Sequence, residues 1–292
     1  MVLKLVIIGN TENYDIANSL LSANNIEIVA GIVDTGFEAR EINQRNFLCK
    51  NKITEIKFDE VKKYNPDVCL IINFSKLIPT EYFKNTLLLN IHGGILPKWR
   101  GSNSNSWAII NNENEVGYTL HEANGVLDGG DIFRVYKVTV GKNDKYGEII
   151  PKLRQKLISD LAETLVNISD GTIKPLTQKQ ANYIYTPKLK TTDGIIENWN
   201  LSSEYIYNLY RVMGAPYGSG VYFKYKNKMF EIKEMNLVEN VIDSYSVPGA
   251  IVFLDNKHMQ VKTANNVIAI SKIAYENNEV NINDIFKIGI RL

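Results

Sequence analysis

The sequence has few of the features that mark specialised protein classes. Only two of its 292 residues are cysteines, Cys49 and Cys69, and they form no C-x-x-C pair. We therefore expect free thiols in a reducing compartment rather than a disulfide framework. The three histidines have no metal-ligand spacing, and no metal is expected. A G-x-G-x-x-G motif is also missing after the first apolar run, which argues against a dinucleotide-binding module.

Long apolar runs are equally scarce. The run at the start of the chain ends at Gly9-Asn10, so it is too short for a signal peptide. No stretch approaches the roughly 20 apolar residues of a membrane span. The net charge of +1 gives no sign of general binding to polyanions. Because 45% of the residues are hydrophobic, the chain can form substantial cores, and we expect a cytoplasmic protein that binds neither membranes nor nucleic acid.

Short apolar runs alternate with helical patterns through the first half of the chain. The expected strands are Val2–Ile8, Ile26–Val33, Val68–Phe74, Leu87–Ile91, Gly117–Glu122 and Ile132–Val140. The expected helices are Tyr14–Asn24 and Gly36–Asn46. This alternation is typical of a doubly wound α/β fold around a parallel sheet.

The second half has a different pattern. Residues Lys145–Asp170 repeat leucine and isoleucine at three- and four-residue steps, which predicts one long helix. The polar residues 177–199 are expected to link a domain of residues 1–176 to a second domain of residues 200–292. In the second domain, short alternating segments separated by turns follow one further helix, and they indicate a smaller β-barrel.

The informative polar residues lie at the end of the fourth expected strand. Asn90 and His92 are two positions apart, so both side chains point to one face of a strand. They stand at its carboxyl end, where open α/β sheets place their sites. Two polar side chains that cap a turn are the alternative interpretation. Downstream, Asp128 and Asp131 both offer a carboxylate partner for His92.

These residues belong to a longer motif. The run N-x-H-x-x-x-L-P-x-W-R-G, with an aspartate 36 residues after the histidine, resembles the folate-dependent formyltransferases. That family includes methionyl-tRNA formyltransferase, glycinamide ribonucleotide transformylase and nucleotide-sugar N-formyltransferases. The resemblance continues through Ile195–Trp199, Arg211–Tyr217 and Pro248–Ile251. It implies a Rossmann-like formyl-folate domain, an OB-like barrel, 10-formyltetrahydrofolate as co-substrate, and Asn90, His92 and Asp128 as the catalytic residues.

The residue types suit formyl transfer to an amine. His92 has the near-neutral pKa that a base needs to accept the amine proton. The amide N–H of Asn90 can donate to the oxyanion that develops on the formyl oxygen. A carboxylate at Asp128 can orient the imidazole and stabilise its protonated form.

The resemblance leaves the acceptor amine open. A single-domain glycinamide ribonucleotide transformylase would lack the residues after about Gly171. Two segments favour a nucleotide amino sugar over transfer RNA: Asp34–Asn51 lacks a Gly/Arg/Lys-rich insertion, and Tyr118–His121 is similar to aminoarabinose-type sugar formyltransferases. A Ser/Asn run at 102–106 replaces the small apolar residues and proline typical of the tRNA enzymes. We expect a homodimer that formylates a dTDP-linked amino-deoxysugar for surface polysaccharide such as O-antigen.

The resemblance also suggests ligand contacts. Arg100 is expected to bind the diphosphate, with a structural pair to an acidic residue as the alternative. Ser102, Asn103 and Asn105 are expected to bind the sugar hydroxyls, although simple capping of a helix explains the Ser/Asn run equally well. The residues expected around the folate are Phe74, Lys76, Leu77, Ile78, Leu127 and Asp128. The alternative functions are methionyl-tRNA formylation and, in a different class, non-catalytic binding of a sugar nucleotide.

Overall fold

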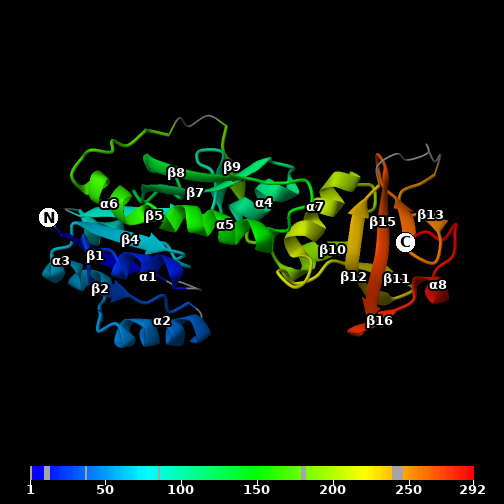
Figure 1. Cartoon of the computed structure of the whole chain (residues 1–292), viewed down its shortest axis with the longest axis horizontal. Helices are drawn as coiled ribbons and strands as arrows, with labels where there is room; N and C mark the ends of the chain where they lie inside the picture. Colours follow the sequence, from blue (N-terminus) through cyan, green and yellow to red (C-terminus); the bar gives the residue numbers. More distant parts are fainter. Residues whose placement is uncertain (1, 10–13, 37, 85, 179–181, 239–245) are drawn as a thin grey trace. The chain divides into compact units, whose positions relative to one another are not determined.

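A computed structural model describes residues 2–9, 14–36, 38–84, 86–178, 182–238 and 246–292 (Figure 1). The chain forms two compact units. The first comprises residues 1–105, 116–138 and 151–187, and the second comprises residues 106–115, 139–150 and 188–292. The first unit therefore extends past residue 176, and two short segments from the first half of the chain belong to the second unit.

The first unit is built on a seven-stranded sheet with the order β3-β2-β1-β4-β5-β7-β8. Its strands are β1 (Leu3–Ile8), β2 (Ile26–Ile32), β3 (Thr54–Glu55), β4 (Val68–Ile72), β5 (Leu87–His92), β7 (Glu115–Glu122) and β8 (Ile132–Thr139). The pairs from β3 to β5 are parallel, whereas β7 pairs antiparallel with β5. The predicted α/β class with a doubly wound parallel sheet is confirmed.

Both faces of this sheet are covered, as expected for parallel strands rich in β-branched residues. On one face, side chains of β1, β2, β4 and β5 form a core with Val61 and Phe83. On the other face, Leu5, Ile7 and Leu70 are also buried. The helical elements of the first unit are α1 (Asp15–Leu21), α2 (Glu38–Lys50), η1 (Phe58–Glu60), α3 (Val61–Tyr64), η2 (Thr80–Phe83) and α6 (Leu161–Ser169). Helices α4 (Ser104–Ile110) and α5 (Tyr146–Ile158) each contribute residues to both units.

The expected long helix over residues 145–170 is wrong in one respect, because α5 and α6 are separate helices. The break lies at Ser159-Asp160, where the Asp160 carboxylate accepts a hydrogen bond of 2.6 Å from Arg134 on β8. The leucine repeat continues across the break, since Leu157, Leu161 and Leu165 are all fully buried. Periodicity therefore located the buried face but could not show the interruption.

The expected linker, residues 177–199, contains regular structure. Strand β9 (Ile184–Thr186) pairs in parallel with β6 (Trp99–Gly101) to form a two-stranded sheet in the first unit. Helix η3 (Thr191–Gly194) and strand β10 (Ile195–Ile196) belong to the second unit. Part of the predicted linker, residues 179–181, lies outside the described residues.

The second unit contains a sheet with the order β10-β11-β12-β15-β14-β13, and β16 pairs with β15. The further strands are β11 (Tyr222–Tyr225), β12 (Lys228–Leu237), β13 (Ile251–Leu254), β14 (Met259–Lys262), β15 (Val267–Tyr275) and β16 (Asn278–Val280). Helices α7 (Ser203–Met213) and α8 (Ile282–Ile285) accompany them. The segments predicted as strands do form a sheet, but the pairings among the described residues do not close it into a barrel.

The second core is aromatic. Phe223 contacts the rings of Trp199, Phe230 and Phe286 at centroid distances of 5.6–6.1 Å, and Phe223 and Phe230 are almost fully buried. Helix α7 is held by Arg211, whose guanidinium donates to the carbonyl oxygens of Asp144 and Gly141 at 2.8 and 2.6 Å. The guanidinium of Arg211 therefore holds α7 in place through these hydrogen bonds.

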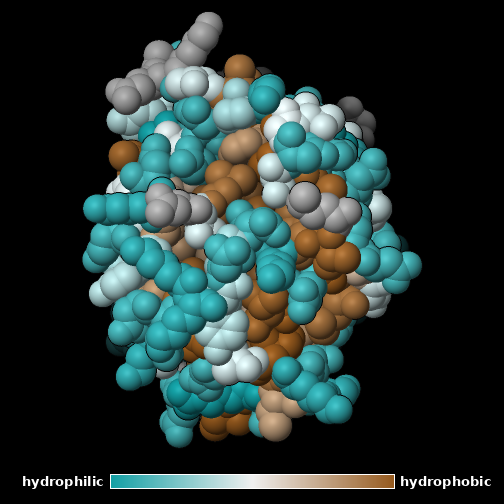
Figure 2. All heavy atoms as spheres, turned by 90° about the vertical axis from the view of Figure 1, so that its left-hand side faces the viewer, coloured by the Kyte–Doolittle hydropathy of each residue, from teal (hydrophilic) through white to brown (hydrophobic). Residues whose placement is uncertain are grey.

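On the face of the molecule shown in Figure 2, hydrophilic side chains predominate and a broken band of hydrophobic surface runs between them. Within the described part of the chain, no helix has both the length and the apolar character needed to span a membrane. Both cysteines are free thiols; Cys49 is exposed, and burial raises the pKa of Cys69 to about 12.

Candidate active site

The antiparallel pairing of β5 with β7 brings the first polar groups together. In this register, Asn90 lies opposite His121 and His92 lies opposite Thr119. Asn90 and His92 are at the carboxyl end of β5, as the sequence predicts, and both follow buried leucines. His92 and His121 are 6% and 1% exposed. The two imidazole rings meet edge to face, with centroids 6.2 Å apart.

Asp128 completes the group from the loop before β8. Its Oδ1 lies 3.4 Å from His92 Nδ1 and 3.6 Å from His121 Nε2. Its Oδ2 accepts a hydrogen bond of 2.8 Å from the backbone N–H of Gly101. The rival carboxylate, Asp131, instead accepts from the hydroxyl of Thr177. The structure thus brings Asn90, His92 and Asp128 together, as the sequence predicts.

Both ring nitrogens of His92 face hydrogen-bond acceptors. Nε2 lies 2.7 Å from the carbonyl oxygen of Trp99, and Nδ1 faces the Asp128 carboxylate. A neutral imidazole carries one N–H and can satisfy only one of these oxygens. When His92 gains a second proton, the new N–H therefore has a hydrogen-bond acceptor already in place. Gly94 is required beside this ring, because a Cβ there would lie 2.6 Å from Nε2 of His92.

Electrostatics keep the base and the carboxylate in complementary states. Burial lowers the pKa of His92 and outweighs the opposing effects of Asp128 and of the Trp99 carbonyl. Burial raises the pKa of Asp128, but the two imidazoles and the Gly101 N–H together outweigh it, so this pKa is lowered. At neutral pH the site therefore holds a neutral imidazole beside an ionised carboxylate, which is the arrangement of a general base with its orienting group.

Asp128 needs support because its backbone has a φ of 48°, a conformation that is unfavourable for a residue with a side chain. Gln178 provides that support. Its amide nitrogen donates to the carbonyl oxygens of Asp128 and Gly130 at 3.0 and 2.6 Å. Its amide oxygen accepts from Arg100 at 2.7 Å. Sequence reasoning missed Gln178, because it lies 50 residues from Asp128 in a polar segment without periodicity.

The β6–β9 pair supplies the backbone groups that face His92 and Asp128. Trp99 and Gly101 on β6 contact His92 and Asp128, as described above. Thr186 on β9 anchors this strand, since its hydroxyl lies 2.8 Å from the carbonyl oxygens of Arg100 and Ser102. The site is therefore an arrangement of buried side chains on β5 and β7, a supported carboxylate loop, and a backbone ribbon.

Comparisons with known proteins show the family of the chain. Residues 19–165 match the model described as formyl transferase, and residues 188–288 match its C-terminal domain. The chain belongs to the formyl transferase family. It is 30% identical to a methionyl-tRNA formyltransferase of Caldanaerobacter subterraneus subsp. tengcongensis, over 80% of this chain and 72% of that protein. It is thus a formyl group transferase.

Solved structures show the same fold. An N-formyltransferase from Helicobacter canadensis, crystallised with folinic acid and dTDP-3-aminofucose, superposes with a TM-score of 0.70 at 19% identity, covering 93% of this chain and 99% of that one. A HypX variant from Aquifex aeolicus superposes with a TM-score of 0.61 at 18% identity over 100% of this chain. The formyltransferase chain spans about half of HypX, 49% of its length.

The residues expected to bind the acceptor differ in accessibility. Arg100 is 4% exposed, and its guanidinium lies 4.4 Å from the ring centroid of Tyr183. Asn105 is also buried, and its side-chain oxygen accepts from the backbone N–H of Gly117. Ser102 and Asn103 are exposed, and α4 begins only at Ser104. In this formyltransferase, Arg100 and Asn105 are therefore buried, whereas Ser102 and Asn103 are exposed.

The residues expected around the folate lie on two loops of the first unit. Phe74 and Ile78 are partly buried against the sheet core, where Ala123 joins them, and Lys76 donates to the Thr35 hydroxyl at 3.2 Å. Three apolar side chains on the same loops remain exposed. They are Leu77, at 82%, Val126, at 56%, and Leu127, at 49%. Two loops at the carboxyl edge of the sheet thus present apolar surface to solvent.

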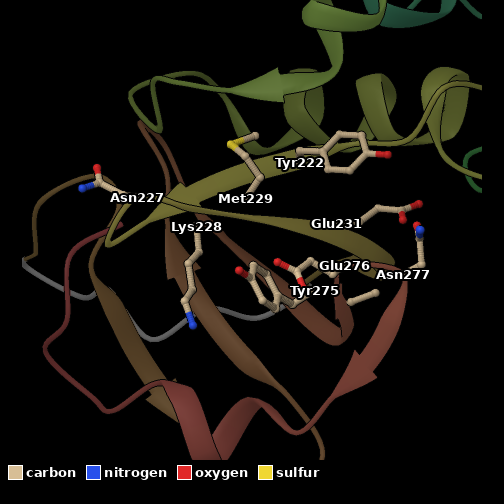
Figure 3. Close-up of a pocket in the computed structure, with 9 residues that line it drawn as sticks. Tyr222, Asn227, Lys228, Met229, Glu231, Tyr275, Glu276 and Asn277 are labelled. Carbon is tan, nitrogen blue, oxygen red and sulfur yellow. The ribbon is translucent and has the colours of Figure 1, made fainter.

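No second site of comparable chemistry is visible in the parts of the chain that the structure describes. A hollow of about 380 Å³ lies in the second unit, between the turns of β11–β12 and β15–β16 (Figure 3). There, Lys228 lies over the ring of Tyr275 at 4.8 Å. Among the described residues, no group of three or more His, Cys, Asp and Glu side chains could hold a metal ion.

Proposed function

We propose that this formyltransferase transfers the formyl group of 10-formyltetrahydrofolate to the amine of a nucleotide-linked amino-deoxysugar, with a dTDP-linked sugar as the best candidate. The observation that carries the reaction type is the group of half-buried Asn90 with buried His92 and Asp128, in which His92 Nδ1 lies 3.4 Å from a carboxylate oxygen. The pKa values of His92 and Asp128 are both lowered, so His92 is unprotonated at neutral pH and can act as a base.

The loops near β4 and β8 suit a folate. A pterin is a flat heteroaromatic ring with polar edges, and such ligands bind to mostly apolar walls with a few polar groups. Leu77, Val126 and Leu127 are exposed apolar side chains on loops that also carry Asp128 and backbone groups. When bound, 10-formyltetrahydrofolate supplies the electrophilic formyl carbon. Leu77 and Leu127 would line the folate site, and Phe74 and Ile78 would form its base.

Each catalytic residue has a defined task in this proposal. Asn90 donates an amide N–H to the oxygen on which negative charge develops, a contribution typically worth about 2.7–4 kcal/mol. His92 accepts the proton that the attacking amine loses. Asp128 and the Trp99 carbonyl then hold the two N–H groups of the imidazolium. Because these acceptors are fixed before the reaction, little reorganisation accompanies proton transfer.

Three observations support a nucleotide amino sugar as acceptor. Residues 34–53 contain the single helix α2 and lead directly to β3, without room for a basic inserted loop. The net charge of +1 provides no general attraction for transfer RNA, whose binding relies on many phosphate contacts. The similar N-formyltransferase from Helicobacter canadensis was crystallised with a dTDP-linked amino sugar. Ser102 and Asn103, which are exposed beside the catalytic residues, are the candidates for contact with the sugar.

Methionyl-tRNA formylation is the second candidate, because the Caldanaerobacter relative has that name. The deciding experiment incubates the purified protein with 10-formyltetrahydrofolate and either a panel of nucleotide amino sugars or initiator methionyl-tRNA. The His92→Asn variant serves as the control for enzyme-dependent formylation. We expect formylation of at least one dTDP-amino sugar. Formylation of the tRNA with no sugar turnover would select the second candidate, and folate and sugar-nucleotide binding without any transfer would indicate a non-catalytic binder.

A further inference from the structure

His121 takes no part in the chemistry proposed above, yet it is among the most buried polar residues of the first unit. It lies on β7 directly opposite Asn90 and is 1% exposed. An imidazole removed from water needs partners for both ring nitrogens. Those partners determine which nitrogen carries the proton, and this in turn determines what His121 does to its neighbours.

The backbone fixes the tautomer. Nδ1 of His121 lies 2.8 Å from the carbonyl oxygen of Glu122, and a carbonyl oxygen can only accept. The proton of the neutral ring is therefore on Nδ1, and Nε2 carries a lone pair. The group nearest to Nε2 is the side-chain amide of Asn90, whose Nδ2 lies 3.0 Å away. This amide nitrogen must be the donor.

The bond has a directional consequence for Asn90. A side-chain amide can rotate by half a turn, which exchanges its oxygen with its nitrogen at little steric expense. An acceptor at Nε2 of His121 selects the orientation with the nitrogen toward β7. One N–H is then used on His121, and the second N–H stays on the nitrogen as a donor for a developing oxyanion. The reversed amide would present its oxygen instead and repel that charge.

One further polar group, the Asp128 carboxylate, faces His121. Its Oδ1 atom lies 3.6 Å from Nε2, which is longer than an ordinary hydrogen bond. Asp128 therefore remains available to His92, whose Nδ1 is nearer at 3.4 Å. His121 and His92 thus serve different partners although both are adjacent to one carboxylate.

We infer that His121 is a positioning residue: as the Nδ1–H tautomer it accepts from Asn90, and this bond fixes the Asn90 amide as the oxyanion donor. The inference rests on formyl transfer as the reaction and holds for either acceptor class. It concerns the orientation of Asn90, so removing the bond should lower kcat while leaving the KM values for folate and acceptor within about twofold.

Two polar substitutions separate positioning from packing. In His121→Gln, the side-chain oxygen can occupy the place of Nε2 and accept from Asn90. In His121→Asn, the shorter side chain retains a polar group near Nδ1 but does not reach Asn90. We expect kcat to fall about tenfold in His121→Asn, the factor that corresponds to one lost hydrogen bond, and to recover to within about threefold of wild type in His121→Gln. His258→Gln, on the second unit, is the matched control and should leave kcat unchanged.

A double-mutant cycle identifies the route of the effect. If His121 acts through Asn90, His121→Asn should change kcat less than about twofold when Asn90 is already alanine. An equal loss in both backgrounds, or wild-type kcat in His121→Asn, would overturn the inference. Absence of turnover by the wild-type protein with every acceptor would instead refute the proposed function.

One measurement requires no substitution. Nitrogen-15 NMR of the histidine side chains in the wild-type protein reports which ring nitrogen carries the proton. For His121 we expect a protonated Nδ1 and an unprotonated Nε2 at neutral pH, with a hydrogen bond from the Asn90 amide to Nε2. A proton on Nε2 would contradict the inference even if the variants at this position failed to fold.

Discussion

The two units bury polar groups for different purposes. In the first unit, Asn90, His92, His121 and Asp128 are brought together at the end of a sheet and bond mainly to one another and to backbone atoms. In the second unit, the core is a cluster of aromatic rings around Phe223, and Arg211 donates to the side chain of Asn208 and to the carbonyl oxygens of Gly141 and Asp144. Burial of a polar group is unfavourable unless it is paired. We propose that the first unit uses such pairing for chemistry, whereas in the second unit Arg211 uses it to hold α7.

This contrast predicts that substitutions in the two regions change different quantities. The largest effect should come from Phe223→Ala, which removes a fully buried ring between Trp199, Phe230 and Phe286. We expect the free energy of unfolding of the second unit to fall by about 3–5 kcal/mol, as measured by urea denaturation. The kcat of the remaining folded protein should stay near that of wild type. A large loss of kcat in fully folded protein would contradict this separation of roles between the two units.

The next largest effect is on catalysis. His92→Asn removes the base but retains a polar side chain of smaller size. We expect kcat to fall at least about 10²-fold, equivalent to about 2.7 kcal/mol of barrier, with little change in the KM for either substrate. Asn90→Ala should have an effect of similar size through loss of the oxyanion donor. Near wild-type turnover in either variant would contradict the role given to that residue.

A smaller effect should follow from loss of the support for the carboxylate loop. Gln178→Leu removes the donor to the Asp128 and Gly130 carbonyl oxygens and the acceptor for Arg100. We expect a loss of roughly tenfold in kcat, because Asp128 is then held less firmly and one net hydrogen bond is worth about 1 kcal/mol. Gln260→Leu on β14 is the matched control, and steady-state kinetics should show no change for it. Equal effects of both variants would show that Gln178 has no special role.

The smallest effect is a shift in titration. Burial lowers the pKa of His92 below its ordinary value of 6.5. The unfolded chain therefore binds more protons than the folded one in the pH range just below 6.5, so folding becomes less favourable as the pH falls through that range. NMR titration of the free enzyme, with His92→Asn used for assignment, should give a midpoint for His92 below 6.5. A midpoint above 6.5 would mean that Asp128 outweighs burial.

The grouping of Asn90, His92 and Asp128 could be predicted from the sequence, through a local pattern and a family motif. Asn90 and His92 follow an apolar strand with a two-residue spacing, which is a local signal. The position of Asp128 came from a family motif, and its distance to His92 agrees with that motif. The bonds of Gln178 and the Asn90–His121 pair could not be predicted, because they depend on loop geometry and on the register between β5 and β7.

The second unit shows a comparable limit. Its strand segments were predicted because hydrophobic alternation is local, whereas closure into a barrel depends on which strand edges meet. The helices α5 and α6 are a similar case: the buried leucines have helical spacing, but this periodicity does not reveal the break at Asp160, where Arg134 and Asp160 form an ion pair of 2.6 Å. The accessibility of Arg100 is a third case. Its residue type suggests phosphate, but the fold buries it against Tyr183 and Gln178.

The β6–β9 ribbon also affects the order in which the enzyme can mature during synthesis. The strands that carry Asn90, His92 and His121 are complete once residue 122 has been made, and the sheet can begin to assemble from the amino terminus. Gln178 and Thr186, which hold the Asp128 loop and strand β6, are translated more than 50 residues later. A nascent chain that ends near residue 170 thus has its catalytic side chains before it has the segment that aligns them. The enzyme should consequently acquire its fold and its activity at separate times on the ribosome.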